Sequence, residues 1–131
     1  MKKQYNNQPR FQAAPQVGEI WLAKFHFDDD RSKYKVRPVF VLDARPFGVS
    51  VAFCGTQKLE ETSSRTDVLL SDEEAIRLGM FRAGKISFGR RETLSMGDFH
   101  RCLGSIGTPG EKLSLLKFRE IAEAVRAAGI M

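Results

Sequence analysis

The sequence predicts a small, mainly β domain: a strongly curved antiparallel sheet or barrel with a short inserted helix and a C-terminal helix. Short runs of β-branched and aromatic residues, separated by polar or glycine-containing segments, are typical of strands and turns. Helix-capping residues precede only two later segments. Short strands followed by one covering helix favour a compact α+β architecture. A chain of 131 residues suffices for one such core.

The first sixteen residues differ in composition from the rest of the chain. They are rich in Gln, Asn and Pro and contain too few apolar residues to bury a face. Lys2, Lys3 and Arg10 account for three of the five net positive charges. We therefore expect a flexible basic tail over 1–16 and a folded domain over 17–131. The low remaining charge does not support a general polyanion binder, although a focused basic site is compatible with it.

Three strands are expected in the first half of the domain. From Gly18 to Phe27 every second position of the first strand is apolar or aromatic. Arg37-Pro38 should open the second strand, 39–42, because proline is confined to the first residue or the edge of a strand. A turn at 45–48 then leads into the third strand, 49–54, to form a hairpin.

The second half combines short strands with two helices. A strand is expected over 67–70, and a last strand or bent strand pair over 86–94. The capping box of Ser71 and Glu74 predicts a helix over 72–78, ended by Gly79.

The C-terminal helix should have Thr108 as N-cap, Pro109 at its first position and Gly129 at its end. Its apolar face is expected to consist of Leu115, Phe118, Ala122 and Val125, with Ile121 beside them.

The cysteines and the apolar runs indicate the compartment. Cys54 and Cys102 lack the spacing of a zinc site and are expected to be buried free thiols. No apolar run is long enough for a membrane span, and no signal-peptide pattern is seen. We expect a cytoplasmic protein without metal or cofactor.

Two polar loops carry the residues suited to chemistry on a phosphodiester. A guanidinium stabilises charge that develops at phosphorus, while a hydroxyl and an amide orient the scissile group. The general base would be a carboxylate or an imidazole. The candidates are Arg37 with Arg31, Lys33 and Lys35 on one loop, Thr56, Gln57 and Lys58 on the other, and Asp28, Asp30 or His26 as the base.

Each candidate has a simpler explanation that the residues alone leave open. A charged loop is usually a solvated connection, and Arg37 could simply pair with an acid of 28–30. His26 alternates out of phase with the aromatic face of its strand, which favours a surface histidine. Trp21 and the strand phenylalanines fit a core better than a base-stacking platform.

The order of these segments resembles the MazF/PemK/Kid toxins of type II toxin–antitoxin modules. The matching residues are GEIWL at 18–22, RPVFVL at 37–42 and CGTQ at 54–57. The similarity in order extends from about Gly18 to Val125.

The resemblance implies an SH3-like β-barrel with a C-terminal helix, a homodimer, and a metal-independent endoribonuclease that cleaves single-stranded RNA to inhibit growth. In that chemistry the 2′-hydroxyl attacks the adjacent phosphate and leaves a cyclic phosphate and a 5′-hydroxyl. Arg37 matches the arginine that stabilises the phosphorane charge or acts in proton transfer. The resemblance also implies a cognate antitoxin whose extended segment covers the RNA groove.

The chain departs from the pattern at three points. Gly55 stands where the family has a first hydroxyl residue, which leaves Thr56 as the only candidate hydroxyl. Ser32 stands where several members have Glu. Arg82 matches the arginine of a later Arg-x-Asp motif, but Gly84 replaces its acid. A diverged, non-catalytic SH3-like module that binds nucleic acid or protein is the alternative.

Overall fold

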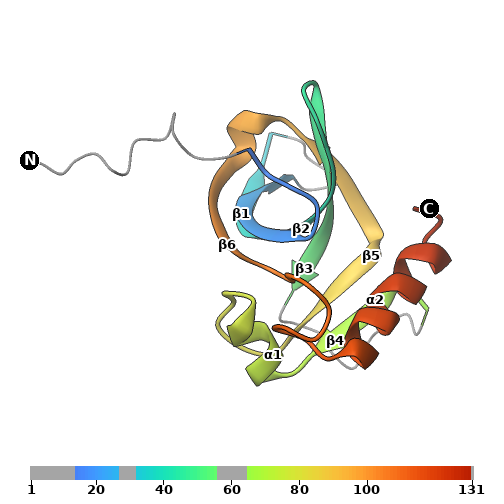
Figure 1. The fold of residues 1–131 in the computed structure, drawn as a ribbon. Helices are drawn as coiled ribbons and strands as arrows, with labels where there is room; N and C mark the ends of the chain where they lie inside the picture. Colours follow the sequence, from blue (N-terminus) through green and yellow to red (C-terminus); the bar gives the residue numbers. More distant parts are fainter. Residues whose placement is uncertain (1–13, 27–31, 56–64, 131) are drawn as a thin grey trace, which may run out of the picture.

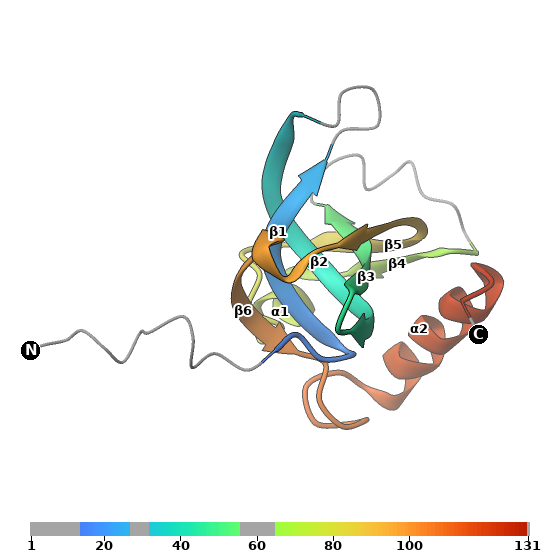
Figure 2. The same cartoon turned by 90° about the horizontal axis from the view of Figure 1, so that it is seen from above.

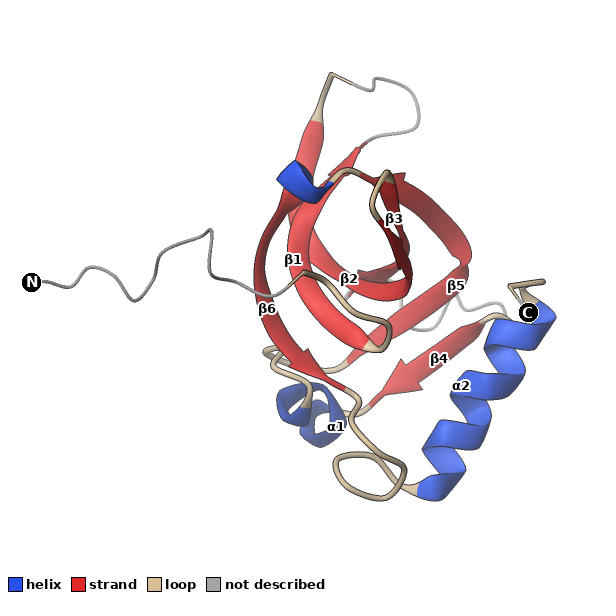
Figure 3. Cartoon of the chain, turned by 45° about the horizontal axis from the view of Figure 1, so that its top comes forward, coloured by secondary structure: helices blue, strands red, loops and turns tan. Residues whose placement is uncertain are grey.

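The computed structural model describes residues 14–26, 32–55 and 65–130, without the side chain of His26 (Figure 1). Six strands form one antiparallel sheet in the order β4-β5-β3-β2-β1-β6. The elements are β1 (Glu19–His26), β2 (Tyr34–Arg45), β3 (Gly48–Gly55), β4 (Asp67–Leu70), α1 (Asp72–Arg77), β5 (Gly84–Leu94), the short 3-10 helix η2 (Met96–Asp98), β6 (Phe99–Ser105) and α2 (Leu115–Ala127). The sheet curls around an interior and both α-helices lie outside it (Figure 3). The predicted mainly β, barrel-like fold class is confirmed.

Alternating side chains of the strands enter two apolar clusters, one on each face of the sheet. The helix-side cluster consists of Ile20, Phe40, Ala52, Cys54, Val68, Leu70, Ala75, Leu78, Met80, Ile86, Phe88, Leu113, Ile121 and Ala124. The inner cluster consists of Trp21, Ala23, Phe25, Val39, Val41, Val49, Val51 and Leu94, with Phe53 and Phe99 packed against it. Since only the first cluster contains helix residues, the second fills the concave side of the sheet. This two-sided burial explains why β1 and β3 are apolar on both faces.

The three strands and the hairpin predicted for the first half of the sheet are present, but β2 is longer than the predicted strand 39–42. β1 pairs with β2, and β2 pairs with β3 through a two-residue turn between Arg45 and Gly48. Trp21 is buried as expected, and its ring meets Phe99 edge to face at 5.7 Å. Both faces of the β2–β3 hairpin contribute to the core, because neighbouring residues such as Val39 and Phe40 belong to different clusters.

The second half of the sheet contains the strands predicted over 67–70 and 86–94, and one strand that was not predicted. Residues 84–94 form one long bent strand, β5, which pairs with β4 before the bend and with β3 along its length (Figure 1). β6 follows it and pairs with β1, although no strand was expected there. Its residues show no alternation of apolar and polar side chains, because β6 is an edge strand whose residues are all at least partly exposed.

Helix α1 agrees with the sequence. Ser71 accepts a hydrogen bond from the Glu74 amide at 3.1 Å, and the Glu74 carboxylate accepts one from the Ser71 amide at 2.9 Å. Gly79 ends the helix region with a φ of 89°. A Cβ there would lie 2.2 Å from the Leu103 carbonyl oxygen, so only glycine fits between α1 and β6.

The start of the C-terminal helix was predicted wrongly. α2 begins at Leu115, and its N-cap is Ser114, which accepts a hydrogen bond from the Lys117 amide at 3.1 Å. Thr108 and Glu111 instead close a separate turn, in which the Thr108 amide donates to the Glu111 carboxylate at 3.3 Å. Gly110 has a φ of 89°, which interrupts the helical backbone at this point. Gly129 lies just past the helix end, as predicted.

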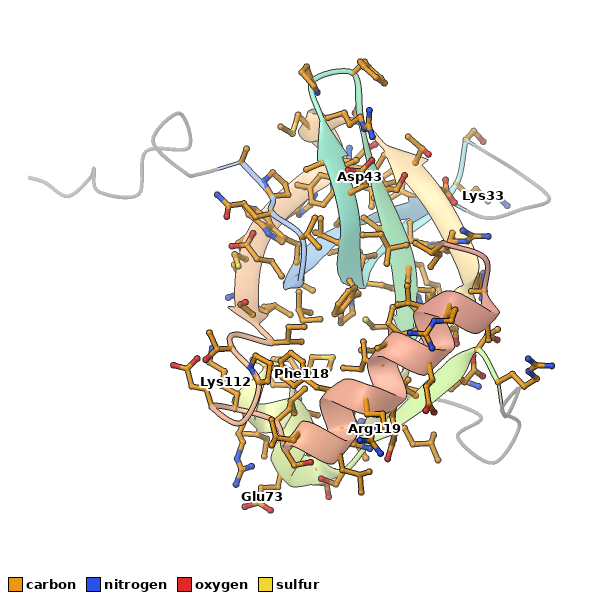
Figure 4. The ribbon with its side chains drawn as sticks, turned by 45° about the vertical axis from the view of Figure 1, so that its right-hand side comes forward. Lys33, Asp43, Glu73, Lys112, Phe118 and Arg119 are labelled. Carbon is orange, nitrogen blue, oxygen red and sulfur yellow. The ribbon has the colours of Figure 1, made fainter. Side chains whose placement is uncertain are left out.

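The buried face of α2 agrees with the prediction only in part. Ile121 and Ala124 are buried, and Phe118 and Val125 pack against the helix-side cluster. Phe118 points from α2 towards the sheet, whereas Arg119 lies on the outer side of the helix (Figure 4). The prediction is thus confirmed for Phe118, Ile121 and Val125. It is wrong for Ala122, which is exposed, and for Leu115, which is 68% exposed because it lies in the first turn, beyond the cluster.

Both cysteines are free, but only one is buried. Burial raises the pKa of the Cys54 thiol far above its usual range, so this thiol stays protonated. Cys102 lies exposed on the edge strand β6, and its predicted burial is therefore wrong. Within the described parts of the chain, no helix is long and apolar enough to cross a membrane.

Candidate basic site

Arg37 and Pro38 lie inside a strand, and not at its entrance as the sequence predicted. β2 already begins at Tyr34 and pairs with β1 from that residue onward. On its other side, the pairing with β3 starts only at Val39, opposite Phe53. Pro38 is tolerated because it has no strand partner on that side, where its missing N–H would otherwise break a ladder. The proline thus marks a short unpaired edge of β2, before Val39 and on the side that faces β3.

Arg37 lies against an aromatic pair at the rim of the inner cluster. We call this pair, Phe25 of β1 and Phe53 of β3, the aromatic shelf; its ring centroids are 5.1 Å apart. The Arg37 guanidinium carbon is 5.4 Å from the Phe53 centroid. Since Arg37 shares its strand face with Val39 and Val41 of the inner cluster, its half-buried side chain extends from the apolar interior towards solvent.

A second guanidinium lies on the same shelf. The Arg90 guanidinium carbon of β5 is 4.6 Å from the Phe53 centroid and 5.3 Å from the Phe25 centroid. A cation over an aromatic face is attracted by the ring quadrupole, with about 0.5–1 kcal/mol at exposed sites. Phe53 of β3 therefore contacts two positively charged side chains, Arg37 and Arg90, one from each strand that flanks β3.

The charges of these two arginines are not neutralised by the rest of the described structure. Among the described residues, neither guanidinium has a carboxylate within salt-bridge distance. A guanidinium presents several N–H donors in a planar fork that fits phosphate oxygens. Arg37 and Arg90 with the aromatic shelf thus form a small site suited to an anion.

Gly55 borders this site at the end of β3. The last β2–β3 pair joins Val39 to Phe53, so Arg37 and Gly55 each lie two residues beyond it. A Cβ on Gly55 would lie 2.7 Å from Cε2 of the Phe53 ring. A side chain at this position would therefore displace the ring that supports both arginines.

A nearly buried ion pair adjoins Gly55 on the next strands. Lys85 pairs with Gly55 in the β3–β5 ladder, and its Nζ is 3.8 Å from Oδ2 of Asp67 on β4. The two side chains are 11% and 9% exposed. The Asp67 carboxylate compensates the Lys85 charge, so this lysine adds little free positive charge to the site.

The structure places three of the predicted basic residues. Lys35 is exposed on the same face of β2 as Arg37 and lies opposite Phe25. Lys33 is exposed just before β2, at the outer end of the sheet (Figure 4). Arg82 is exposed in the turn between α1 and β5, and no contact among the described residues joins it to Arg37.

The other candidates are outside the described part of the chain. These are Asp28, Asp30, Arg31, Thr56, Gln57 and Lys58, together with the side chain of His26. The pairing of Arg37 with an acid of 28–30 is likewise outside it. Within the described ranges, no group of three or more His, Cys, Asp or Glu side chains is arranged to hold a metal ion.

Sequence reasoning missed Arg90, because the side of β5 that it faces is set by a bulge. Before the bulge Ser87 pairs with Phe53, whereas after it Arg91 pairs with Ala52. As a result, even-numbered Ile86 and Phe88 face the helix-side cluster, whereas Leu94 faces the inner cluster. A period-two pattern cannot be continued across such a shift.

This fold is the fold of the MazF toxins and related endoribonucleases. Seen from above, the sheet is strongly curved and α2 lies on its outer side (Figure 2). Solved structures with this fold match most of the chain. No family model and no curated protein matches the sequence.

Three similar structures are all mycobacterial. The Mycobacterium tuberculosis toxin MazF-mt6 has a TM-score of 0.58 at 21% identity and covers 86% of this chain and 97% of its own. An endoribonuclease from a mycobacterial species has a TM-score of 0.56 at 18% identity, covering 91% and 95%. A mycobacterial endoribonuclease in complex with its cognate antitoxin has a TM-score of 0.60 at 16% identity, covering 90% and 98%. At these identities the likeness establishes the fold.

Proposed function

We propose that this protein is a toxin of a type II toxin–antitoxin module that cleaves single-stranded RNA without a metal ion. The observation that carries the proposal is Arg37, held over Phe53 with no carboxylate partner among the described residues. The fold supports it, because structures of the same fold include endoribonucleases and a toxin.

In the proposed reaction the 2′-hydroxyl of a ribose attacks the adjacent phosphorus, and the bond to the 5′-oxygen of the next nucleotide breaks. The products are a 2′,3′-cyclic phosphate and a 5′-hydroxyl. Arg37 would stabilise the negative charge that develops on the phosphorane oxygens, because a guanidinium can donate two hydrogen bonds to them. Thr56 is the proposed hydroxyl that orients the scissile group, and Asp28, Asp30 and His26 are the candidates for the base. Arg31, Lys33, Lys35, Gln57, Lys58 and Arg82 are proposed substrate-binding residues.

The test is cleavage of a long single-stranded RNA by the purified protein in the presence of EDTA. Wild-type protein should produce fragments with 5′-hydroxyl ends, which polynucleotide kinase labels without prior phosphatase treatment. Arg37→Ala should reduce the rate by about a hundredfold or more, as for loss of a group that stabilises transition-state charge.

Arg45→Ala is the matched control for this test. Arg45 lies at the opposite end of β2, where its Nε contacts Oδ2 of Asp43 at 2.8 Å in an exposed pair. Its removal should leave the rate unchanged. Absence of cleavage by wild-type protein, or equal rates for wild type and Arg37→Ala, would contradict the proposal.

An antitoxin and a second copy of the chain are proposed partners. One structure of the same fold is in complex with its cognate antitoxin. Co-expression with the product of a short neighbouring gene should relieve growth inhibition, and the two proteins should co-purify. Light scattering of the free protein would show whether it is a homodimer.

A non-catalytic binding module is the second candidate, and Gly55 favours it. Glycine has no side chain and cannot supply a hydroxyl here, and a Cβ at this position would meet the Phe53 ring at 2.7 Å. A binding module would be harmless when overexpressed and would bind RNA or an extended peptide without forming products. Steep dependence of RNA affinity on salt would indicate a nucleic-acid ligand.

A further inference from the structure

Arg90 differs from Arg37 in its place on the aromatic shelf. Arg37 lies over Phe53 alone, at 5.4 Å, whereas Arg90 lies over both Phe53 and Phe25, at 4.6 Å and 5.3 Å. The two guanidiniums therefore occupy separate points along the shelf. Because both guanidinium carbons lie near the Phe53 centroid, they are at most about 10 Å apart. This separation does not exceed the Debye length, which is about 10 Å at 0.1 M salt. An anionic group at either point is attracted by both charges.

The side chains of both arginines are positioned so that their N–H donors can bind an anion. An arginine that packs on a ring keeps its N–H donors at the guanidinium edge, where a phosphate can approach. Ordering by the ring lowers the conformational entropy that the side chain loses on binding. Arg90 is exposed, and no carboxylate among the described residues pairs with it.

We propose that Arg90 is a second RNA-binding residue, which holds a phosphate of the single strand next to the phosphate held by Arg37. This inference rests on the proposed function, since it takes RNA as the ligand. Two fixed charges at separate points suit successive phosphates of one RNA strand. In this proposal only Arg37 contacts the reacting phosphate, so Arg90 contributes to binding of the substrate in its ground state. The aromatic shelf sets the distance between the two points.

The neighbouring Arg91 provides a matched control. It has the same charge and is adjacent in the sequence, but it lines a groove between the sheet and α2 together with Phe40 and Ile121. It thus lies near the helix-side cluster and away from the aromatic shelf. Removal of either arginine changes the net charge equally, but only removal of Arg90 is expected to weaken binding of single-stranded RNA.

The first measurement is equilibrium binding of a labelled, mixed-sequence oligoribonucleotide with a 2′-O-methyl group on every ribose, followed by fluorescence anisotropy. This strand cannot be cleaved, because its 2′-oxygens are blocked. Arg90→Gln should weaken binding about tenfold and lower the slope of log affinity against log salt by about 0.7, the value for one phosphate contact on a single strand. Arg91→Gln should change affinity less than about twofold, since it lacks a phosphate contact. Arg90→Lys should keep the salt slope with lower affinity, because lysine retains the charge without the fork.

The second measurement separates binding from chemistry. On cleavable RNA, Arg90→Gln should raise KM about tenfold and leave kcat nearly unchanged, as for a group that binds substrate and transition state equally. A fall in kcat at constant KM would overturn the assignment to ground-state binding. Equal effects of Arg90→Gln and Arg91→Gln, or no binding of the strand by wild-type protein, would overturn the proposal as a whole. If wild-type protein binds the blocked strand but cleaves no RNA, the proposed activity fails while the salt slopes still decide the role of Arg90.

Discussion

Phe53 is the residue on which the candidate site depends most directly. Its ring contacts Phe25, supports the Arg37 and Arg90 guanidiniums and occupies the space above Gly55. A side chain with contacts on so many sides transmits any change in its position to all of them. The site is therefore sensitive to the size of residues that carry no charge.

Gly55→Ala tests this dependence. The new methyl group would lie 2.7 Å from the Phe53 ring, which must then move. We expect a loss of about 1–3 kcal/mol in the free energy of unfolding, as for overpacking, measured by urea denaturation. Gly97→Ala is the control, because a Cβ there would have only Ser95 Oγ nearby, at 3.9 Å.

Phe53→Leu should reduce the cost of Gly55→Ala when the two changes are combined, since a smaller side chain leaves room for the methyl group. An unchanged stability in Gly55→Ala would show that the ring is not held in place over Gly55.

At the level of elements, the sequence predicted most of what is set by local signals. β1, the β2–β3 hairpin and α1 follow from alternation, a turn and a capping box, which act within a few neighbouring residues. The start of α2 was missed because two capping patterns compete, at Thr108 and at Ser114, and the positive φ of Gly110 decides between them. Such a backbone conformation cannot be read from residue types, because glycine is compatible with either choice.

Ser114→Ala should therefore destabilise the start of α2. Loss of the N-cap hydrogen bond to the Lys117 amide is expected to cost about 1 kcal/mol. Hydrogen exchange of the first-turn amides should become faster. Thr108→Ala should leave these amides protected, since the Thr108 side chain bonds to Glu111 in a separate turn. The reverse pattern would place the start of the helix near Pro109.

On the scale of the whole molecule, the segment order identified the fold, although no single strand is distinctive. GEIW in β1 and RPVFVL in β2 lie side by side in antiparallel register, so the spacing of the two motifs reflects one structural unit. The candidate site was predicted less completely. Arg37 was predicted from the Arg-Pro motif. Arg90 lies on a strand far along the chain, and only the sheet order β5-β3-β2 brings it near Arg37.

The domain boundary can be tested by removing residues 1–13. In the described structure the first anchoring contacts are the hydrogen bonds from the Gln16 amide to the Glu19 carboxylate at 2.8 Å and from the Gly18 amide to the Val41 carbonyl at 3.0 Å. A chain that begins at Ala14 keeps both. We expect its free energy of unfolding to change by less than about 0.5 kcal/mol, the usual range for surface changes. A clearly larger loss in urea denaturation would show that residues 1–13 pack on the domain.

The bulge in β5 has a consequence for the divergence of related chains. Because Arg91 to Leu94 form one register after the bulge, insertion or deletion of one residue between Arg91 and Leu94 would exchange the sides of Arg90 and Arg91 if Leu94 keeps its place in the inner cluster. Two homologues with the same pair of arginines could then differ in which one borders Phe53. Alignments of such chains should be anchored on Leu94, and the number of residues between the arginine pair and this leucine would indicate which arginine reaches the aromatic shelf.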